Sequence, residues 1–224
     1  MSAARPAAPR RGGPRPWLKP AVFTAALAPL AAIGLQAARG TLGANPVAEA
    51  LNRLGLTALV FLVASLACTP AREVLGWTWA IGLRRMLGLF AYFYACLHFA
   101  TYAIVDQGLR GRAIVADVTK RPFILSGFAA FLLLTPLAAT STAASVRRLG
   151  FPAWKRLHRL VYAAGALAAF HFWLRVKKDV REPAIYAAVL GVLLAARLIV
   201  RAREGRRRAG RDARGPAGAA PTVD

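Results

Sequence analysis

The chain has 224 residues, of which 57% are hydrophobic, and its mean hydropathy is +0.45. A soluble domain of this length rarely has such a composition, so the sequence indicates a membrane protein. The formal net charge of +22 would suit a nucleic-acid-binding protein, but the Lys and Arg residues lie between and beyond long apolar runs. That placement is typical of loops beside a membrane, and we expect lipid contact and no nucleic-acid partner.

Six segments contain the roughly 20 apolar residues that a helix needs to cross the hydrocarbon core. They are 17–37, 47–67, 86–105, 123–143, 158–175 and 184–202. The sequence therefore predicts an all-α bundle of six transmembrane helices over residues 17–203. The Gly-, Pro- and Ala-rich basic ends, 1–16 and 204–224, are expected to be disordered tails.

Prolines mark the expected boundaries. Pro46, Pro122 and Pro183 precede predicted spans, and Thr69-Pro70 follows the second span. Most Lys and Arg residues fall on the side of the bundle that carries both termini, which places the N- and C-termini in the cytoplasm. The basic residues of the loop 106–122 are exceptions to this rule. The sequence has no phosphate-binding glycine motif and no internal repeat, so no nucleotide or nicotinamide site is expected.

The chain has three histidines, His98, His158 and His171, and each lies in a predicted span or at its edge. An imidazole is costly in a membrane unless it has a partner, so each is a candidate ligand or hydrogen-bonding group. The third and fifth spans run in the same direction. His98 and His171 lie at similar distances from the starts of these spans, about 20 Å above the cytoplasmic edge. Two imidazoles at one depth can take the two axial positions of a haem iron.

A stripe of small residues precedes His98 on one face of its helix: Gly88, Ala91 and Ala95. These side chains would leave room for a flat macrocycle and are candidate cofactor-binding residues. The alternative is that the stripe packs against another helix, as small residues commonly do in membranes.

His158 has no histidine partner at its depth. It would bind a second haem, form a hydrogen bond to a quinone or flavin, or make a purely structural contact. Arg84, Arg85 and Arg159 would suit haem propionates or a flavin phosphate beside it, although the same residues satisfy the positive-inside preference. On an ideal helix His158 and His171 would point in different directions, unless the helix is distorted, for example near Gly165.

Short blocks of residues occur in a characteristic order between about residues 50 and 200. They are Arg84-Arg85-Met86-Leu87-Gly88-Leu89, Leu97-His98, Asp117 with Lys120-Arg121-Pro122, Thr135-Pro136-Leu137-Ala138, Leu157-His158-Arg159-Leu160-Val161-Tyr162, and His171-Phe172 with Lys177. These blocks resemble those of the ferric-reductase-like transmembrane superfamily. Within it they resemble the MsrQ (YedZ) haem-binding membrane subunits of periplasmic methionine sulfoxide reductase systems.

The resemblance implies one or two b-type haems, with His98 and His171 as axial ligands, and FMN in some members. It implies that electrons come from the quinone pool or a cytosolic flavin reductase. They would pass across the bacterial inner membrane to a periplasmic, molybdopterin-containing catalytic subunit of the MsrP type, which repairs oxidised methionine. No segment remains for the flavin and nicotinamide domain of wider relatives, so we expect a separate donor and an electron-transfer subunit rather than a catalytic one.

Two other functions compete with this interpretation. A stand-alone ferric or oxygen reductase would need a substrate pocket, and the expected outer loops at 38–46, 106–122 and 176–183 are short. A cofactor-free transporter or assembly scaffold would need charged groups along a path, and the predicted span interiors contain almost no acidic residues.

Overall fold

The computed structural model describes residues 16–176 and 179–212, and no strand occurs among them. The helices are α1 (Leu18–Ala38), α2 (Pro46–Leu75), α3 (Thr78–Ala100) continuing into the π-helix η1 (Thr101–Asp106), α4 (Gly111–Lys120), α5 (Pro122–Ala139), α6 (Ala143–Leu149), α7 (Phe151–Leu157), α8 (Leu160–Arg175) and α9 (Arg181–Asp212). The all-α prediction is confirmed. Most of the tail residues lie outside the described part, although α9 continues past residue 204.

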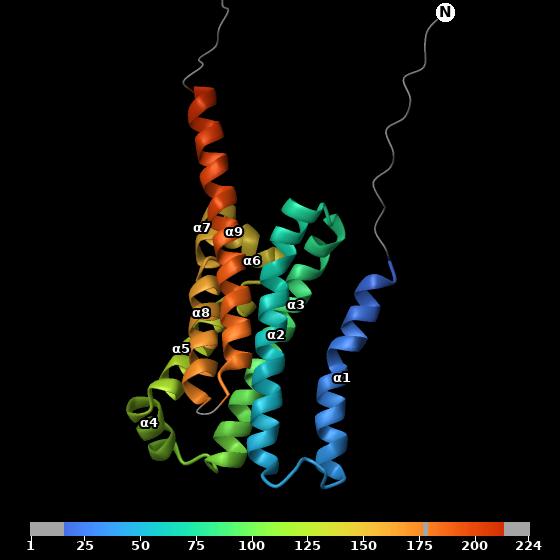
Figure 1. Ribbon diagram of the computed structural model, residues 1–224, viewed down its shortest axis with the longest axis vertical. Helices are drawn as coiled ribbons and strands as arrows, with labels where there is room; N and C mark the ends of the chain where they lie inside the picture. The colour runs from blue at the N-terminus through green and yellow to red at the C-terminus, as the bar shows by residue number, and fades with distance from the viewer. Residues whose placement is uncertain (1–15, 177–178, 213–224) are drawn as a thin grey trace, which may run out of the picture.

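Five described helices are long and apolar enough to cross a membrane: α1, α2, α3 with η1, α5 and α9 up to Val200. The remaining expected span, 158–175, corresponds to α8, which has only 16 residues. That length is below the roughly 20 residues that normally cross the hydrocarbon core. Figure 1 nevertheless shows α8 running beside α5 and α9 through the body of the bundle.

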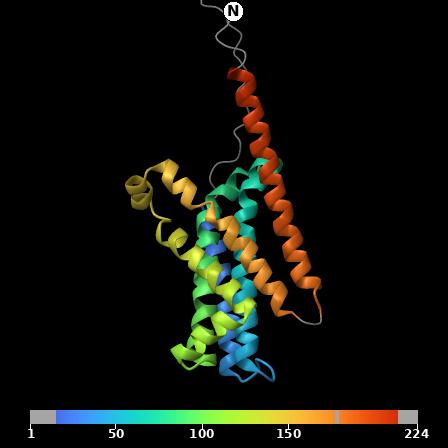
Figure 2. The same cartoon turned by 90° about the vertical axis from the view of Figure 1, so that its left-hand side faces the viewer.

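The bundle is built from two packed helix pairs. Helix α2 packs chiefly against α3, and α5 packs chiefly against α8, while α9 lies against α8 and α2. Figures 1 and 2 show α4 at one end of the bundle and the short helices α6 and α7 near the other end. The start of α1 and the end of α9 both lie at the α6–α7 end.

Several proline boundaries lie where the sequence indicated. Pro46 opens α2 beside an Asn45 side chain that accepts a hydrogen bond from the Ala48 amide, and Pro122 opens α5. Pro183 lies in the first turn of α9.

The predicted end of the second span at Thr69-Pro70 is wrong. Helix α2 continues through Pro70 to Leu75 and ends at Gly76, which adopts a left-handed φ of 69°. Proline removes one backbone hydrogen bond but does not end a helix whose flanking residues are held by packing. Thr69 is buried here and its hydroxyl accepts a hydrogen bond from Arg84.

The fourth span also ends earlier than predicted, at Ala139 rather than 143. The hydroxyls of Thr140 and Ser141 donate to the carbonyls of Pro136 and Leu137, which lie in the last turn of α5. The Pro136 carbonyl also accepts from the Thr140 amide, whereas the Ser141 amide bonds to Ala138, so the Ser141 hydroxyl satisfies the Leu137 carbonyl that a continuing helix would have used. Thr142 then caps α6 by accepting from the Ser145 amide.

The fifth predicted span is interrupted at its first residues. Helix α7 ends at Leu157, and α8 begins at Leu160. His158 and Arg159 form the junction between them, so His158 and His171 do not share one continuous helix. The interruption lies at this junction and not near Gly165, which lies within α8 next to Leu190 and Leu66.

Helix α1 is attached to the bundle through Tyr94 of α3, whose side chain is 0% exposed. The Tyr94 hydroxyl donates to the Ala26 carbonyl at 2.7 Å and accepts from the Leu30 amide at 3.2 Å. These two backbone groups would normally bond to each other, so the hydroxyl lies within the hydrogen-bond ladder of α1, next to Pro29. Figure 1 shows the N-terminal part of α1 leaning away from α2 and α3.

We expect Tyr94→Phe to loosen α1 while leaving the rest of the bundle intact. The variant keeps the buried ring but removes the bridging hydroxyl, which should reduce stability by about 1 kcal/mol. Hydrogen–deuterium exchange in detergent should show faster exchange around Leu30. Tyr186→Phe is the control, because the Tyr186 hydroxyl makes no hydrogen bond within the described residues. Unchanged exchange in α1 would contradict this account of the attachment.

Candidate haem site

One cavity of the bundle lies between α2, α3, α5 and α8 and has a volume of about 360 Å³. His98 of α3 and His171 of α8 both line it, and we call it the His98–His171 cavity. Its walls are mostly apolar, with a few polar groups toward the α4 end. This combination is typical of a pocket for a large, largely hydrophobic ligand.

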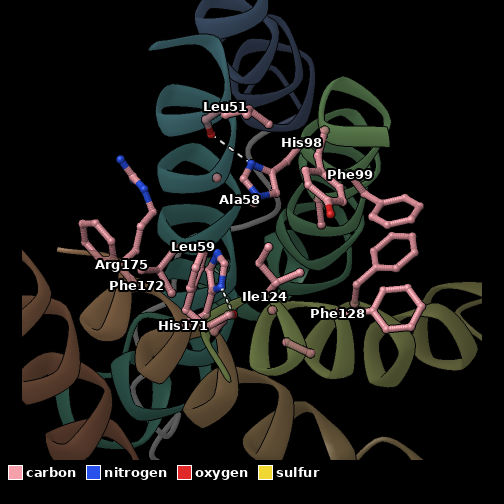
Figure 3. A pocket seen from close by; sticks show the side chains of 18 of the residues that line it. Leu51, Ala58, Leu59, His98, Phe99, Ile124, Phe128, His171, Phe172 and Arg175 are labelled. Atoms are coloured by element: carbon pink, nitrogen blue, oxygen red, sulfur yellow. Dashed lines mark hydrogen bonds between the residues drawn. The ribbon is translucent and has the colours of Figure 1, made fainter. Parts of the chain in front are cut away.

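The imidazoles of His98 and His171 face each other across this cavity, as Figure 3 shows. Their ring centroids are 6.1 Å apart and their planes make an angle of 81°. The expectation that these residues lie at one depth is therefore correct. The helices that carry these histidines do not pack chiefly against each other, because α3 packs mainly on α2 and α8 packs mainly on α5.

Each of these imidazoles is held by a backbone carbonyl of a neighbouring helix. His98 Nδ1 lies 2.9 Å from the carbonyl oxygen of Leu51 on α2. His171 Nδ1 bonds in the same way to the carbonyl of Phe123 on α5. A carbonyl only accepts, so both Nδ1 atoms carry the proton and both Nε2 atoms keep a free lone pair. Among the described residues, no hydrogen-bond partner takes either Nε2.

Both rings also lie against a glycine of the same neighbouring helix. A Cβ placed on Gly55 would come within 3.1 Å of His98 Nδ1 and Cε1. On Gly127 it would come within 2.6 Å of His171 Nδ1 and 2.8 Å of Cε1. The two glycines thus allow the imidazoles to approach the backbone closely.

The α3 stripe divides between two locations. Ala91 and Ala95 line the His98–His171 cavity, as a cofactor-binding role requires. Gly88 lines a different cavity and lies against Ser65, where an added Cβ would be 3.3 Å from the Ser65 hydroxyl oxygen. The stripe therefore supplies cavity wall at one end and helix packing at the other.

Aromatic side chains form one wall of the His98–His171 cavity. Phe99 stacks on Phe131 at 5.1 Å and contacts Phe128 at 5.8 Å between ring centroids. Phe131 also stacks on Tyr92, which lines a second cavity that contains His158. Such rings suit contact with the face or edge of a flat conjugated ligand.

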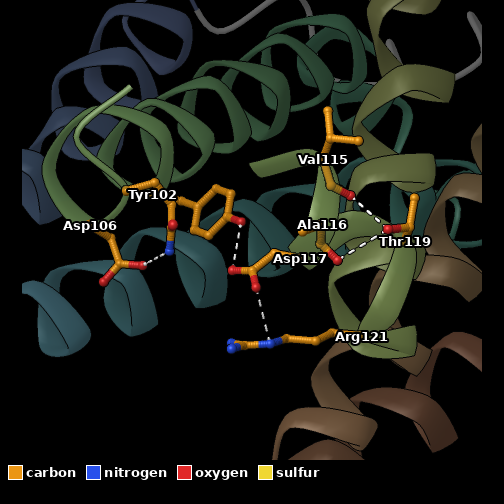
Figure 4. Close-up of polar contacts among 8 residues, drawn as sticks. Tyr102, Asp106, Val115, Ala116, Asp117, Thr119 and Arg121 are labelled. Atoms are coloured by element: carbon orange, nitrogen blue, oxygen red, sulfur yellow. Dashed lines mark hydrogen bonds and ion pairs between the residues drawn. The ribbon is translucent and has the colours of Figure 1, made fainter. Parts of the chain in front are cut away.

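The polar groups of this cavity lie toward its α4 end. Arg175, one turn beyond His171, lines the cavity. Figure 4 shows Asp117 of α4 accepting from the Tyr102 hydroxyl and pairing with Arg121, both at 3.2 Å. Arg121 balances the Asp117 carboxylate, and Arg175 is a second cation at the wall of the cavity.

A second cavity lies toward the α6–α7 end and contains His158, so we call it the His158 cavity. Arg84 and Arg85 line it, as expected for residues near His158. Arg159 is exposed and lines neither cavity, so it does not join Arg84 and Arg85 in the His158 cavity.

His158 is held differently from the other two histidines. Its ring stacks on Trp154 at 4.0 Å, and its Nδ1 lies 3.2 Å from the Trp154 carbonyl in the same short segment. The Leu137 carbonyl of α5 also lies near the ring. Its Nε2 is buried without a hydrogen bond, and a buried polar atom of this kind normally has a partner.

The two cavities share a thin partition. Leu62 of α2 and Leu134 of α5 line both of them and are almost fully buried. Ala91 and Ala164 pack against this pair. The partition is therefore one layer of side chains, and a group in one cavity would lie close to a group in the other.

Comparison with known proteins places this arrangement in a family. The family model described as "Ferric reductase like transmembrane component" matches residues 48–169. That range includes Gly55, His98, Gly127 and His158 and ends just before His171. The chain belongs to the ferric-reductase-like transmembrane family. No solved structure matches it.

Relatives of this ferric-reductase-like chain include three bacterial proteins, each named protein-methionine-sulfoxide reductase heme-binding subunit MsrQ. One from Rhodospirillum rubrum is 52% identical over 85% of this chain and 91% of its own length. One from Deinococcus radiodurans is 53% identical over 88% and 97%. One from Ralstonia nicotianae is 48% identical over 80% and 83%. The chain is thus a member of the MsrQ group and a multi-pass protein of the bacterial inner membrane.

The residues of the His98–His171 cavity fit a haem. An iron between two imidazoles, with metal–nitrogen bonds of about 2 Å, separates the ring centroids by about 6 Å. The described residues contain no group of three or more His, Cys, Asp or Glu side chains that could hold a bare metal ion. Two facing imidazoles in an apolar cavity instead suit a metal whose other ligands come from a porphyrin.

Sequence reasoning missed several residues of this site. Arg175 follows His171 by four positions, a spacing that places both on one helical face, and could have been found. Gly55 and Gly127 gave only the weak signal of a glycine inside a helix. The Leu51 and Phe123 carbonyls gave no sequence signal, because every residue has a backbone carbonyl.

Proposed function

We propose that this chain is a b-type haem subunit. It would pass electrons from the quinone pool or a flavin reductase, across the inner membrane, to a periplasmic molybdopterin-containing methionine sulfoxide reductase. The observation that carries the proposal is the pair of facing imidazoles with free Nε2 atoms in the His98–His171 cavity. The names of the relatives support it, since they describe haem-binding subunits of that reductase.

Several residues of the cavity have a defined part in this function. His98 and His171 would ligate the iron through Nε2, and Arg175 would pair with a haem propionate. Ala91 and Ala95 leave space beside the ring, and the phenylalanine wall excludes water. A bound haem iron supplies one-electron chemistry, and the protein supplies position, burial and a dry surrounding.

The proposed path runs through both cavities in series. The partition of Leu62 and Leu134 keeps the two compartments apart by one layer of side chains, which shortens the distance that an electron must cross. We propose that His158 contacts a second redox group, either another haem or a quinone or FMN, with Arg84 and Arg85 beside its acidic substituents.

For the topology we propose six crossings with both termini in the cytoplasm. The start of α1 and the end of α9 lie at the same end of the bundle in Figure 1, as an even number of crossings requires. Helix α8 would complete the sixth crossing together with the junction before it. The basic loop residues near α6 and α7 favour a cytoplasmic location for that end. The His98–His171 cavity would then open toward the periplasm.

A stand-alone ferric or oxygen reductase is the alternative. Helix α4 occupies most of the 106–122 loop, which leaves little room for a separate substrate pocket. Reconstitution with quinol and either the molybdoenzyme or a ferric chelate separates the two functions. Preferential reduction of the chelate would contradict the proposed function.

We expect His98→Ala and His171→Ala to abolish the b-type absorbance of the reduced protein, because each removes one axial ligand. The measurement is a reduced-minus-oxidised spectrum of protein purified after expression with added haem. Helical content by circular dichroism controls for folding. If a variant keeps the wild-type spectrum, the histidine that it lacks is not a haem ligand.

Ala95→Leu should weaken haem binding without touching a ligand. The larger side chain would enter the cavity beside His98, and overpacking of this kind costs about 1–3 kcal/mol, or roughly 5- to 150-fold in affinity. Haem titration of the haem-free protein measures the effect. The matched control is Ala166→Leu on the exposed face of α8. Equal affinity in both variants would mean that haem does not occupy this cavity.

His158→Ala identifies the occupant of the second cavity through the ratio of haem to protein in a pyridine haemochrome assay. A ratio near two in the wild type that falls to near one indicates a second haem. A ratio near one in both proteins, with slower reduction by quinol in the variant, indicates a quinone or flavin contact. If neither the ratio nor the reduction rate changes, His158 is structural.

A further inference from the structure

The same local arrangement occurs at both histidines of the His98–His171 cavity. In each case a glycine on one helix lies against the imidazole, and the carbonyl four residues earlier on that helix accepts the Nδ1 proton. The pairs are Gly55 with Leu51 for His98, and Gly127 with Phe123 for His171. We call each pair a glycine seat. Leu51 precedes His98 by 47 residues and Phe123 precedes His171 by 48, so the two halves of the bundle are equivalent here.

The glycine is what makes the carbonyl reachable. A helical carbonyl points along the helix toward the amide four residues later, and the side chain at that later position normally covers its flank. Without a Cβ, a donor from outside the helix can approach the oxygen from the side. A third case follows the same rule: Ser65 donates to the Arg84 carbonyl at 2.9 Å while lying against Gly88.

A seat constrains an imidazole in two ways at once. The carbonyl bond selects the Nδ1-protonated tautomer and directs Nε2 away from the seat, and the flat glycine surface limits rotation of the ring plane. With one seat on α2 and the other on α5, the two planes are held at 81°. A Cβ on Gly127 would overlap Nδ1 and Cε1 of His171, so that ring would have to shift, and a Cβ on Gly55 would press on the same atoms of His98 and displace that ring by a few tenths of an ångström.

We infer that Gly55 and Gly127 are positioning residues that hold the two haem-ligating imidazoles in nearly perpendicular planes. This inference rests on the proposed function, because it concerns the same pair of ligands. Perpendicular axial imidazoles leave two iron d orbitals nearly equal in energy, whereas parallel planes separate them. The orientation is therefore visible in the electron paramagnetic resonance (EPR) spectrum of the ferric, low-spin protein.

The test compares EPR spectra of Gly55→Ala, Gly127→Ala and the parent protein. All are made in a His158→Ala background, so that a second haem does not contribute. The parent should show a single strongly shifted low-field feature, which indicates perpendicular planes. Each glycine variant should move toward a three-line rhombic spectrum or lose the low-spin signal, with about tenfold weaker haem binding. Gly191→Ala is the control, because a Cβ there meets nothing within 4 Å.

The possible failures are distinguishable. A rhombic spectrum in the parent, or an unchanged spectrum in both folded glycine variants, would overturn the inference while the haem proposal stands. Haem that persists in His98→Ala and His171→Ala would overturn the proposed function instead. Loss of haem from a glycine variant with normal helical content supports the inference. If Gly127→Ala does not fold, Gly55→Ala, whose contact is looser, and the parent spectrum decide the question.

Discussion

The structure depends on the hydrogen bonds that join two imidazoles to backbone carbonyls of other helices. In an apolar bundle nearly every backbone group is already bonded within its helix, so a buried imidazole N–H has few acceptors. Leu51 and Phe123 supply them at the two glycine seats. Because these bonds use Nδ1, Nε2 stays available in the cavity. The tautomer, the direction of each ring and the fit of a metal between them follow from one contact type.

That contact also explains how the helices are paired. Helix α2 must hold α3 close enough for His98 to reach its seat, and α5 must hold α8 in the same way for His171, and these are the two most extensive helix pairings. The cavity is the space between the pairs. The halves correspond in geometry although no internal repeat is visible in the sequence, because only a glycine, a carbonyl and a histidine need to correspond.

Much of this could be predicted from the sequence. Hydropathy indicates the helices, and depth along the third and fifth spans brings His98 and His171 together. The errors occur where tertiary contacts outweigh local signals. Pro70 does not end α2, which continues to Leu75, and the buried Thr69 hydroxyl beside this proline accepts from Arg84 of α3. Helix α5 ends early, where the Ser141 amide bonds to Ala138 and the Ser141 hydroxyl takes the Leu137 carbonyl. The seats could not be predicted, because a glycine in an apolar run does not show which side chain lies against it.

The two cavities differ in how their histidines are held, and this difference suits different roles. His98 and His171 are bonded across helix pairs, so turning either ring would require moving one helix relative to another. His158 is bonded and stacked to Trp154 within its own short segment, between the ends of α7 and α8. Trp154 is in turn attached to the end of α5, because its indole N–H donates to the Thr140 carbonyl. Support from two helix pairs suits the metal ligands proposed above, and support centred on one short segment suits the proposed contact with an electron donor.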